Sequence, residues 1–339
     1  MTAETPFSRR RALKTLFCSS AALALNVRRE AKAQVEIPPE SLQLFAIGDY
    51  GTGGADQRRV AAAMKGFVEK NAIRPNGLLM VGDNFYSEDK EGFSTESSRW
   101  KNQIEDMYPP EAFACPMWPV LGNHDYHDNY KGEKVQLAYA RKPGVRWTMP
   151  GKWFRVDLGS QPLVTFLFLD SNYRSISGGF KRPSFSTGFR FRSLKEDEEE
   201  EQLEWFKAEL EKPRAPFTVV VSHHPLYSNG EHGDSRTLIK EWGGLLQKHQ
   251  VHAYICGHDH DMQHLEIEGK FTSFVLSGGG GAKTRGANDN RTVPFYKETY
   301  GFSHLSITPE ALKISHYDDF GNPLHGFQKN LDGTVVLPT

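Results

Sequence analysis

Short apolar runs alternate with segments of helical periodicity along the first half of the chain. Runs of strand length, four to eight residues, predict β-strands, whereas apolar residues spaced three and four apart predict helices. The expected strands are 42–48, 78–81 and 117–121, and the expected helices are 57–70, 97–107 and 133–142. Alternation of this kind is typical of an α/β protein.

The second half continues with more β-structure. Two strands flank a Gly159-Ser160 turn and two more flank Glu268-Gly269-Lys270, so we expect two antiparallel pairs. The expected strands are 153–158, 163–169, 217–221, 253–256, 265–267, 271–276, 302–307 and 312–317, and the expected helices are 194–210 and 238–249. Residues 319–339 are expected to be a C-terminal tail that packs on the domain.

The first 33 residues differ from the rest. Arg9-Arg10-Arg11 precedes a modest apolar run and Ala31-Lys32-Ala33, a pattern typical of a twin-arginine export signal with its cleavage site. The run is shorter than the ~20 residues of a membrane-spanning helix. A basic amphipathic N-terminus or a membrane anchor is the alternative. We predict an export signal over 1–33, a linker over 34–41, transient contact with the export machinery, and a periplasmic or secreted protein without stable membrane association after cleavage.

Composition narrows the function only slightly. The 339 residues carry a formal net charge of −1, so there is no basic surplus to neutralise a nucleic-acid backbone. Of three cysteines, Cys18 lies in the predicted signal. Cys115 and Cys256 are compatible with a disulfide in an oxidising compartment or with two buried thiols.

Metal-competent side chains follow five of the predicted strands, at the point where each strand ends. Ligands bind at the carboxyl edge of the strands in open α/β sheets, so these residues should converge. They are Asp49, Asp83, Asn123, His223 and the pair His258 and His260. If the backbone stays extended after Gly257, the two histidines of the pair point the same way, and each can reach one of two adjacent metal ions.

This constellation resembles the calcineurin-like metallophosphoesterases and, within them, the small, tartrate-resistant type of purple acid phosphatase. The similarity runs from about residue 43 to residue 317. The matching motifs are Asp49-x-Gly51, Gly82-Asp83-x-x-Tyr86, Gly122-Asn123-His124-Asp125, Val220-x-x-His223, Glu231-His232-Gly233 and Gly257-His258-x-His260. The resemblance implies a four-layer α/β/β/α sandwich of two mixed sheets flanked by helices, with the metallophosphoesterase domain over 42–318.

One substitution distinguishes the purple acid phosphatases from most other metallophosphoesterases. Most metallophosphoesterases have a ligand histidine where this chain has Gly51, and Tyr86 is placed to replace it. A phenolate is a hard anionic oxygen ligand, which favours trivalent iron. The resemblance implies a ferric ion held by Asp49, Tyr86, His260 and one oxygen of Asp83. It implies a second ion, Fe²⁺, Zn²⁺ or Mn²⁺, held by Asn123, His223, His258 and the other oxygen of Asp83, with His224 replacing His223 if the register differs by one.

The resemblance further implies an acid phosphatase that hydrolyses phosphate monoesters by attack of metal-bound hydroxide. The expected catalytic residues are His124, the adjacent Asp125 and His232. The two histidines match outer-shell residues of the family and are candidates for general acid and phosphate contact. Aryl phosphates, nucleotides and phosphoproteins are candidate substrates, and the basic-aromatic loop 174–192 either selects among them or is simply solvated. The alternatives are a phosphodiesterase or nucleotide pyrophosphatase on the same scaffold, and a redox-active iron protein.

Overall fold

The computed structural model describes residues 41–177, 192–288 and 291–337. The predicted export signal and nearly all of the predicted linker lie outside these residues. The described residues belong to one compact unit, Ile37–Thr339. Within them, no helix has both the length and the apolar character needed to cross a membrane.

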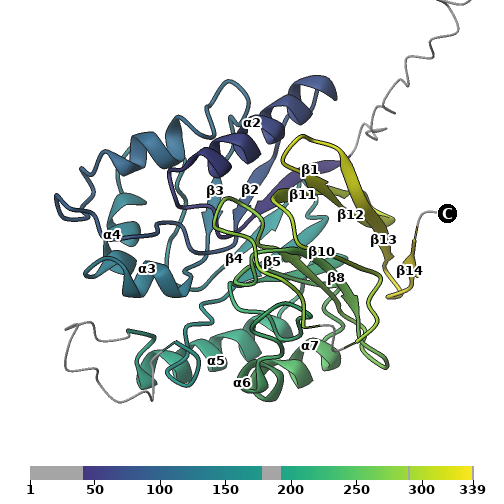
Figure 1. The fold of residues 1–339 in the computed structure, drawn as a ribbon. Coiled ribbons are helices and arrows are strands. Elements are labelled where there is room, and N and C mark those ends of the chain that lie inside the picture. The colour runs from purple at the N-terminus through teal and green to yellow at the C-terminus, as the bar shows by residue number, and fades with distance from the viewer. Residues whose placement is uncertain (1–40, 178–191, 289–290, 338–339) are drawn as a thin grey trace, which may run out of the picture. The chain divides into compact units, whose positions relative to one another are not determined.

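Two seven-stranded sheets form the centre of this unit (Figure 1). The first has the order β14 (Val335–Val336), β13 (Pro323–Asn330), β12 (Ala311–Asp318), β11 (Gly301–Ile307), β1 (Leu42–Ile47), β2 (Gly77–Met80) and β3 (Met117–Pro119). The second has the order β10 (Phe295–Lys297), β8 (Met262–Glu266), β9 (Ser273–Ser277), β7 (Ala253–Cys256), β6 (Phe217–Val221), β5 (Val164–Phe168) and β4 (Phe154–Leu158). Both sheets contain parallel and antiparallel pairs, as predicted.

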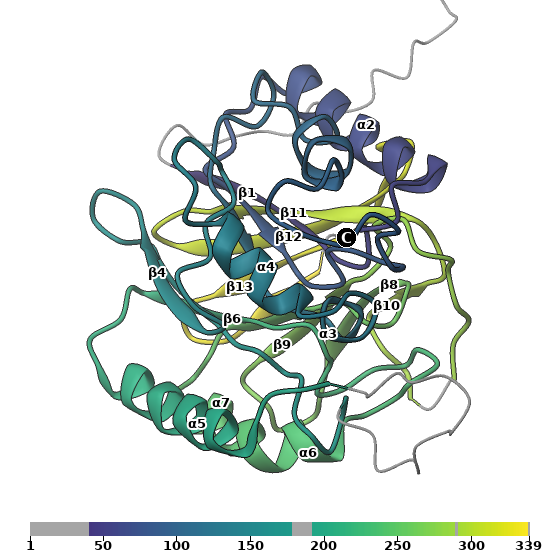
Figure 2. The ribbon, with the colours of Figure 1, turned by 90° about the vertical axis from the view of Figure 1, so that its left-hand side faces the viewer.

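Helices cover the outer faces of the two sheets, which confirms the expected fold class (Figure 1, Figure 2). On the first sheet, Phe67 of α2 packs with ring centroids 5.8 Å from Phe45 and 6.0 Å from Phe302. On the second, Phe206 and Trp242 are fully buried in a cluster that includes strand residues of β6 and β7. The helical segments are α2 (Ala55–Lys70), the π-helical turn η1 (Trp100–Glu105), α3 (Asn123–His127), α4 (Gly132–Tyr139), α5 (Glu196–Glu211), α6 (Arg236–Leu238), η2 (Ile239–Gly243) and α7 (Gly244–Lys248).

The inner faces of the sheets contact each other directly. The ring of Trp118 on β3 lies 6.3 Å from that of Phe168 on β5. The Ser277 hydroxyl of β9 donates to the carbonyl of Ala46 on β1 over 2.9 Å. Ser277 is the last residue of β9, and β7 runs parallel to and beside β9. The contact between Ser277 and β1 therefore brings the carboxyl ends of β1 and β7 close to each other.

Most predicted elements are present, with ends shifted by a few residues. The antiparallel pairs β4–β5 and β8–β9 are confirmed. The short helix α3 was not predicted, and the helix expected over 97–107 contains the π-helical turn η1. Cys115 and Cys256 are separate buried thiols, so the disulfide alternative is wrong.

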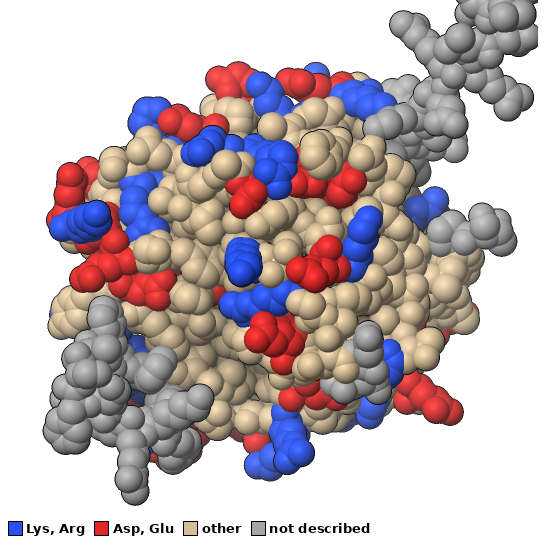
Figure 3. Space-filling model, viewed as in Figure 1, with Lys and Arg blue, Asp and Glu red and all other residues tan. Residues whose placement is uncertain are grey.

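The expected C-terminal tail is part of the first sheet. β13 pairs antiparallel with β12, and β14 continues beyond β13. An uncovered β12 would present unpaired backbone groups at the edge of the sheet, and β13 satisfies them. The domain therefore extends past residue 318. On the face shown in Figure 3, basic and acidic side chains are interspersed rather than separated by sign.

Candidate metal centre

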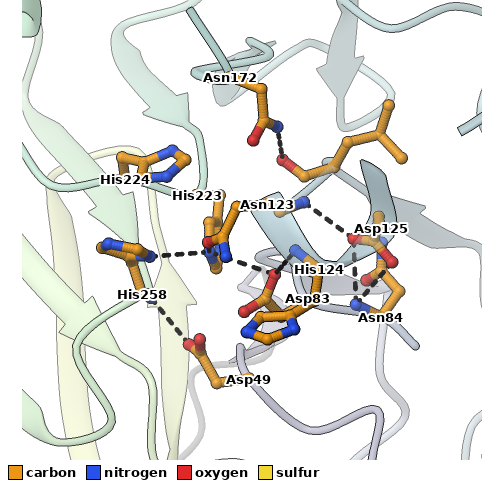
Figure 4. Close-up of polar contacts among 12 residues, drawn as sticks. Asp49, Asp83, Asn84, Asn123, His124, Asp125, Asn172, His223, His224 and His258 are labelled. Carbon is orange, nitrogen blue, oxygen red and sulfur yellow. Dashed lines mark hydrogen bonds and ion pairs between the residues drawn. The ribbon is translucent and has the colours of Figure 1, made fainter. Parts of the chain in front are cut away.

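The side chains predicted to bind metal follow strands of both sheets. Asp49 and Asp83 come directly after the turns that leave β1 and β2, and Asn123 begins α3 after β3. His223 follows β6, and His258 follows β7. Because these strands belong to parallel stretches of the two sheets, their carboxyl ends meet at one edge (Figure 4).

The four residues expected to hold the ferric ion lie together. The Tyr86 hydroxyl is 2.9 Å from Oδ2 of Asp83, 3.3 Å from Oδ1 of Asp49 and 3.3 Å from Nε2 of His260. Nε2 of His260 is also 3.5 Å from Oδ1 of Asp49. We call these residues the tyrosine set.

The residues expected to hold the divalent ion form a second group beside the first. Nε2 of His223 lies 3.2 Å from Oδ1 of Asn123, 3.3 Å from Nδ1 of His258 and 3.4 Å from Oδ1 of Asp83 (Figure 4). The two oxygens of Asp83 therefore face different groups. We call Asn123, His223, His258 and Asp83 the amide set.

Two of the imidazoles are oriented by backbone carbonyls. Nδ1 of His223 is 3.0 Å from the carbonyl oxygen of Val81, and Nδ1 of His260 is 2.7 Å from that of Lys283. A carbonyl accepts only from N–H, so it assigns the proton to Nδ1 and leaves the lone pair of Nε2 directed into the centre. Histidines that bind metal ions are generally oriented in this way.

The electrostatics of the carboxylates and the phenol fit bound cations. Asp49 and Asp83 are buried side by side, and among the described residues no lysine or arginine pairs with either. Burial and the charge of Asp83 raise the pKa of Asp49, and burial with both carboxylates raises the pKa of Tyr86. Burying anionic groups without a counter-charge is unfavourable. Cations at this site would relieve that penalty and allow the phenol to ionise.

The histidines are in the form that binds metal. Burial lowers the pKa of His223, His258 and His260, to about 4 for the last, so the rings are neutral near pH 7. Neutral imidazole is the ligand form of histidine. With two carboxylates, a phenol and an amide, the donors suit a pair of adjacent cations.

The backbone at the centre corrects one expectation. The chain does not stay extended after Gly257, because β7 ends at Cys256 and His258 has a φ of 71°, in the left-handed region. The N–H of Asp259 then bonds back to the carbonyl of Gly257. As a result the two histidines of the pair face the centre through different nitrogens, Nδ1 of His258 and Nε2 of His260. Asp49 and Asp83 have similar positive φ angles, 57° and 53°, and such strain is common at functional sites.

Position 51 lacks the ligand histidine, and the packing around it also requires a glycine. A Cβ on this residue would lie 2.1 Å from the carbonyl oxygen of Asn84 and 2.5 Å from the nitrogen of Phe85. The N–H of Tyr86 also bonds to the carbonyl of Gly51 over 2.9 Å. The segment that delivers Tyr86 therefore occupies the space that any side chain at position 51 would need.

Two partly exposed histidines lie at the rim of the centre. The ring of His124 is 4.4 Å from that of Tyr86, and its Nδ1 is 2.9 Å from Oδ2 of Asp128. Burial acts to lower the pKa of His124, but the hydrogen bond to Asp128 and nearby carboxylates outweigh it, so the pKa lies above its usual value. The ring of His232 is 4.2 Å from that of His258, and its Nδ1 is 2.6 Å from Oδ1 of Asp259.

Asp125, expected to be catalytic, is buried beside the turn that carries Asp83. Its carboxylate accepts hydrogen bonds from the backbone N–H groups of Gly122, Asn84 and Phe85 and from the side chain of Gln136. These bonds join the turn after β2 to the start of α3. The geometry supports a positioning role for Asp125 in place of a catalytic one.

His224 and the loop complete the expected set. Nδ1 of His224 is 2.8 Å from the Ser171 hydroxyl, and its ring lies 4.3 Å from that of His258. His223, His224 and His258 nevertheless form a group whose nitrogens lie within 4.8 Å of one another.

Of the loop 174–192, residues 178–191 lie outside the described part. Its flanks adjoin α3, where Nε2 of His127 is within 3.1 Å of the carbonyls of Ser177 and Arg192.

Sequence reasoning missed Arg285, whose guanidinium lies 3.2 Å from Nε2 of His232. The signal that could have found it is the run of four glycines at 278–281, shortly before it. A Cβ on Gly278 would lie 2.0 Å from the carbonyl oxygen of Asp259, and one on Gly280 would lie 2.2 Å from that of Gly48. Such a run indicates a backbone that passes close to another part of the chain.

Comparisons with known proteins agree with this geometry. The family model described as calcineurin-like phosphoesterase matches residues 42–262. Purple acid phosphatase 7 of Arabidopsis thaliana is 32% identical over 293 residues, covering 84% of this chain and 85% of that protein. Tartrate-resistant acid phosphatase type 5 of Homo sapiens is 28% identical over 301 residues, covering 84% and 89%.

Solved structures support the fold. GAP50, described as the anchor in the inner membrane complex of Plasmodium, has a TM-score of 0.70 and 22% identity over 86% of this chain and 89% of that one. Purple acid phosphatase PPD1 from yellow lupin has a TM-score of 0.61 and 16% identity, covering 86% of this chain and 54% of that one. From the family match, the plant relative and the arrangement of the strand-end ligands, we conclude that the chain belongs to the calcineurin-like phosphoesterases and, among them, to the purple acid phosphatases.

Proposed function

We propose that this protein is an acid phosphatase that hydrolyses small phosphate monoesters at a centre of one ferric and one divalent ion. The observation that carries the proposal is the Tyr86 hydroxyl, which lies within 3.3 Å of both carboxylates and of His260. A phenolate in that position is the hard anionic donor that trivalent iron prefers. The names of the curated relatives, purple acid phosphatase 7 and tartrate-resistant acid phosphatase type 5, support the same activity.

The tyrosine set would hold the ferric ion, and the amide set would hold Fe²⁺, Zn²⁺ or Mn²⁺. When bound, such ions stabilise negative charge on a phosphoryl group and lower the pKa of water well below its value in bulk. Asp83 serves both sets because its oxygens face different ones.

The chain's own residues supply orientation and protons. Asp128 accepts from Nδ1 of His124, which leaves Nε2 to hold a proton for the departing alcohol. Asp259 holds the ring of His232 against that of His258, where it can contact an oxygen of the bound ester. Asp125 fixes the turn that carries Asp83 by accepting from Asn84 and Phe85.

The test compares p-nitrophenyl phosphate with bis-p-nitrophenyl phosphate at about pH 5, together with metal analysis and a visible spectrum. We expect hydrolysis of the monoester in clear preference to the diester, with iron and phenolate-to-iron absorption. Preference for the diester would replace the proposal by a phosphodiesterase. Oxidation that depends on peroxide and survives phosphate inhibition, without ester hydrolysis, would replace it by a redox protein.

We also propose that the protein is exported through the twin-arginine route to the periplasm or beyond. Support comes only from the Arg9-Arg10-Arg11 pattern and the Ala31-Lys32-Ala33 site, which lie outside the described residues. Replacing Arg9 and Arg10 with lysine should keep the full-length precursor in the cytoplasmic fraction. Unchanged processing and location of the variant would refute the route.

A further inference from the structure

The guanidinium of Arg285 lies at the rim of the centre, one side chain further out than His232. Its Nη1 is 3.2 Å from Nε2 of His232, and the ring of His232 is 4.2 Å from that of the metal-ligand candidate His258. Arg285 also contributes a positive charge that acts on Asp49 and His260. The arginine is therefore close enough to the centre to act on a bound ester, while its guanidinium contacts His232 and Glu231, neither of which belongs to the tyrosine set or the amide set.

The position of Arg285 is held by contacts of its own loop. The side-chain amide of Asn288 donates to the carbonyls of Gly230 and Glu231, directly before His232, over 3.0 and 2.9 Å. The N–H of Asn288 donates to the carbonyl of Asn229 over 2.7 Å. These bonds tie the loop that carries Arg285 to the loop that carries His232. The two side chains are thus placed as one unit, without needing a bound ligand to bring them together.

The charge of Arg285 is poorly neutralised. Among the described residues its one ion pair is with Glu231, at 3.6 Å, and the Glu231 side chain is 64% exposed. Nearby Arg291 differs, because its guanidinium pairs with Asp234 at 2.5 Å. An exposed pair at the longer distance contributes little, so an incoming anion can displace Glu231 from Arg285 at small cost.

We infer that Arg285 is a specificity-determining residue that binds a second phosphate, carried by the leaving group of the substrate. The inference rests on the proposed function. Because the guanidinium contacts His232, which itself packs against His258, it is placed one side chain further from the ligands than His232 and can meet the part of an ester that extends from the centre. A guanidinium binds phosphate through paired hydrogen bonds, so a diphosphate, whose outgoing group carries a phosphate next to the scissile one, fits this position. The favoured substrate class is then compounds with two linked phosphates, such as nucleoside diphosphates.

The experiment compares ADP with p-nitrophenyl phosphate in the wild type, Arg285→Gln, Arg285→Lys and the control Arg291→Gln. For Arg285→Gln we expect KM for ADP to rise about 10- to 100-fold, the size of a charge-assisted contact, with less than about 3-fold change for p-nitrophenyl phosphate. Arg285→Lys should recover part of the loss, because the charge remains but the paired geometry does not. Arg291→Gln should leave the ratio of the two substrates unchanged.

A binding measurement separates this inference from the proposed function. Calorimetry with the methylene analogue of ADP and with inorganic phosphate alone reports affinity without turnover. Weaker analogue binding by Arg285→Gln, with phosphate binding preserved, supports the inference. This result stands even if the wild type hydrolyses neither ester. Absence of hydrolysis would refute only the acid phosphatase proposal. Equal losses for both substrates would mean that Arg285 contacts the scissile phosphoryl group, and no loss for either would mean that it contacts neither. Both results overturn the inference.

Discussion

The hydroxyl of Tyr86 lies 2.9 Å from Oδ2 of Asp83, three residues earlier in the chain. Both residues belong to the segment that follows β2, so this one segment places the Asp83 carboxylate and the Tyr86 hydroxyl beside each other. Burial first of all, and then the charges of Asp83 and Asp49, raise the pKa of this phenol. The phenolate therefore needs a strongly charged cation beside it.

Replacing Tyr86 with phenylalanine should abolish visible absorption and lower the content of trivalent iron. The ring and its packing remain, but the oxygen that would bind iron is lost. Absorption spectroscopy with metal analysis checks the result. Tyr50→Phe is the matched control, since the Tyr50 hydroxyl is buried nearby but donates to Asn84. Colour that survives in Tyr86→Phe would show that another residue is the source of the charge transfer.

Gly51→Ala should destabilise the protein by about 1–3 kcal/mol or more, because the added methyl overlaps the backbone at Asn84. Urea denaturation of the two proteins measures the difference. Gly66→Ala is the control, as a Cβ there meets nothing within 4 Å and helix α2 should gain about 0.5–1 kcal/mol. An unchanged midpoint for Gly51→Ala would mean that the space beside Asn84 is not required to be empty.

His124→Ala should lower kcat for p-nitrophenyl phosphate by about 10²–10⁴-fold and leave the metal content intact. His124 lies at the rim, and its Nδ1 contacts Asp128, not a ligand of the centre. Steady-state kinetics and metal analysis of the same preparation separate the two effects. Loss of metal together with activity would make His124 a structural support of the centre.

Stability should fall in acid partly through His304. This ring is buried against Phe45 and Phe67, and burial lowers its pKa to about 3. The unfolded chain takes up the proton near pH 6.5, so the contribution is complete above that pH and is lost as pH falls toward 3. Between about pH 7 and about pH 5, the wild type should lose about 2 kcal/mol more than His304→Gln, as measured by urea titrations. Equal losses would refute the assignment, because the other buried histidines are common to both proteins.

The sequence by itself determined the strands, the main helices and which side chains stand at the strand ends. Apolar runs report burial locally, and Asp49, Asp83 and His223 each follow such a run directly. It also indicated that Gly51 and Tyr86 are linked, because the ligand histidine is absent at position 51 and Tyr86 is placed to replace it. The resemblance to a known family supplied the division of these residues between two ions.

Only the tertiary structure decided how the residues meet. The left-handed turn at His258, the nitrogens that face the centre and the burial of Asp125 all depend on contacts between segments far apart in the sequence, which no local pattern encodes. The same holds for β13, whose pairing with β12 lies outside the periodicity of either strand, and for Arg285, which reaches His232 across 53 residues of sequence. Local periodicity records which residues avoid water, whereas the direction of a side chain toward a distant partner is set by contacts that form only in the folded chain.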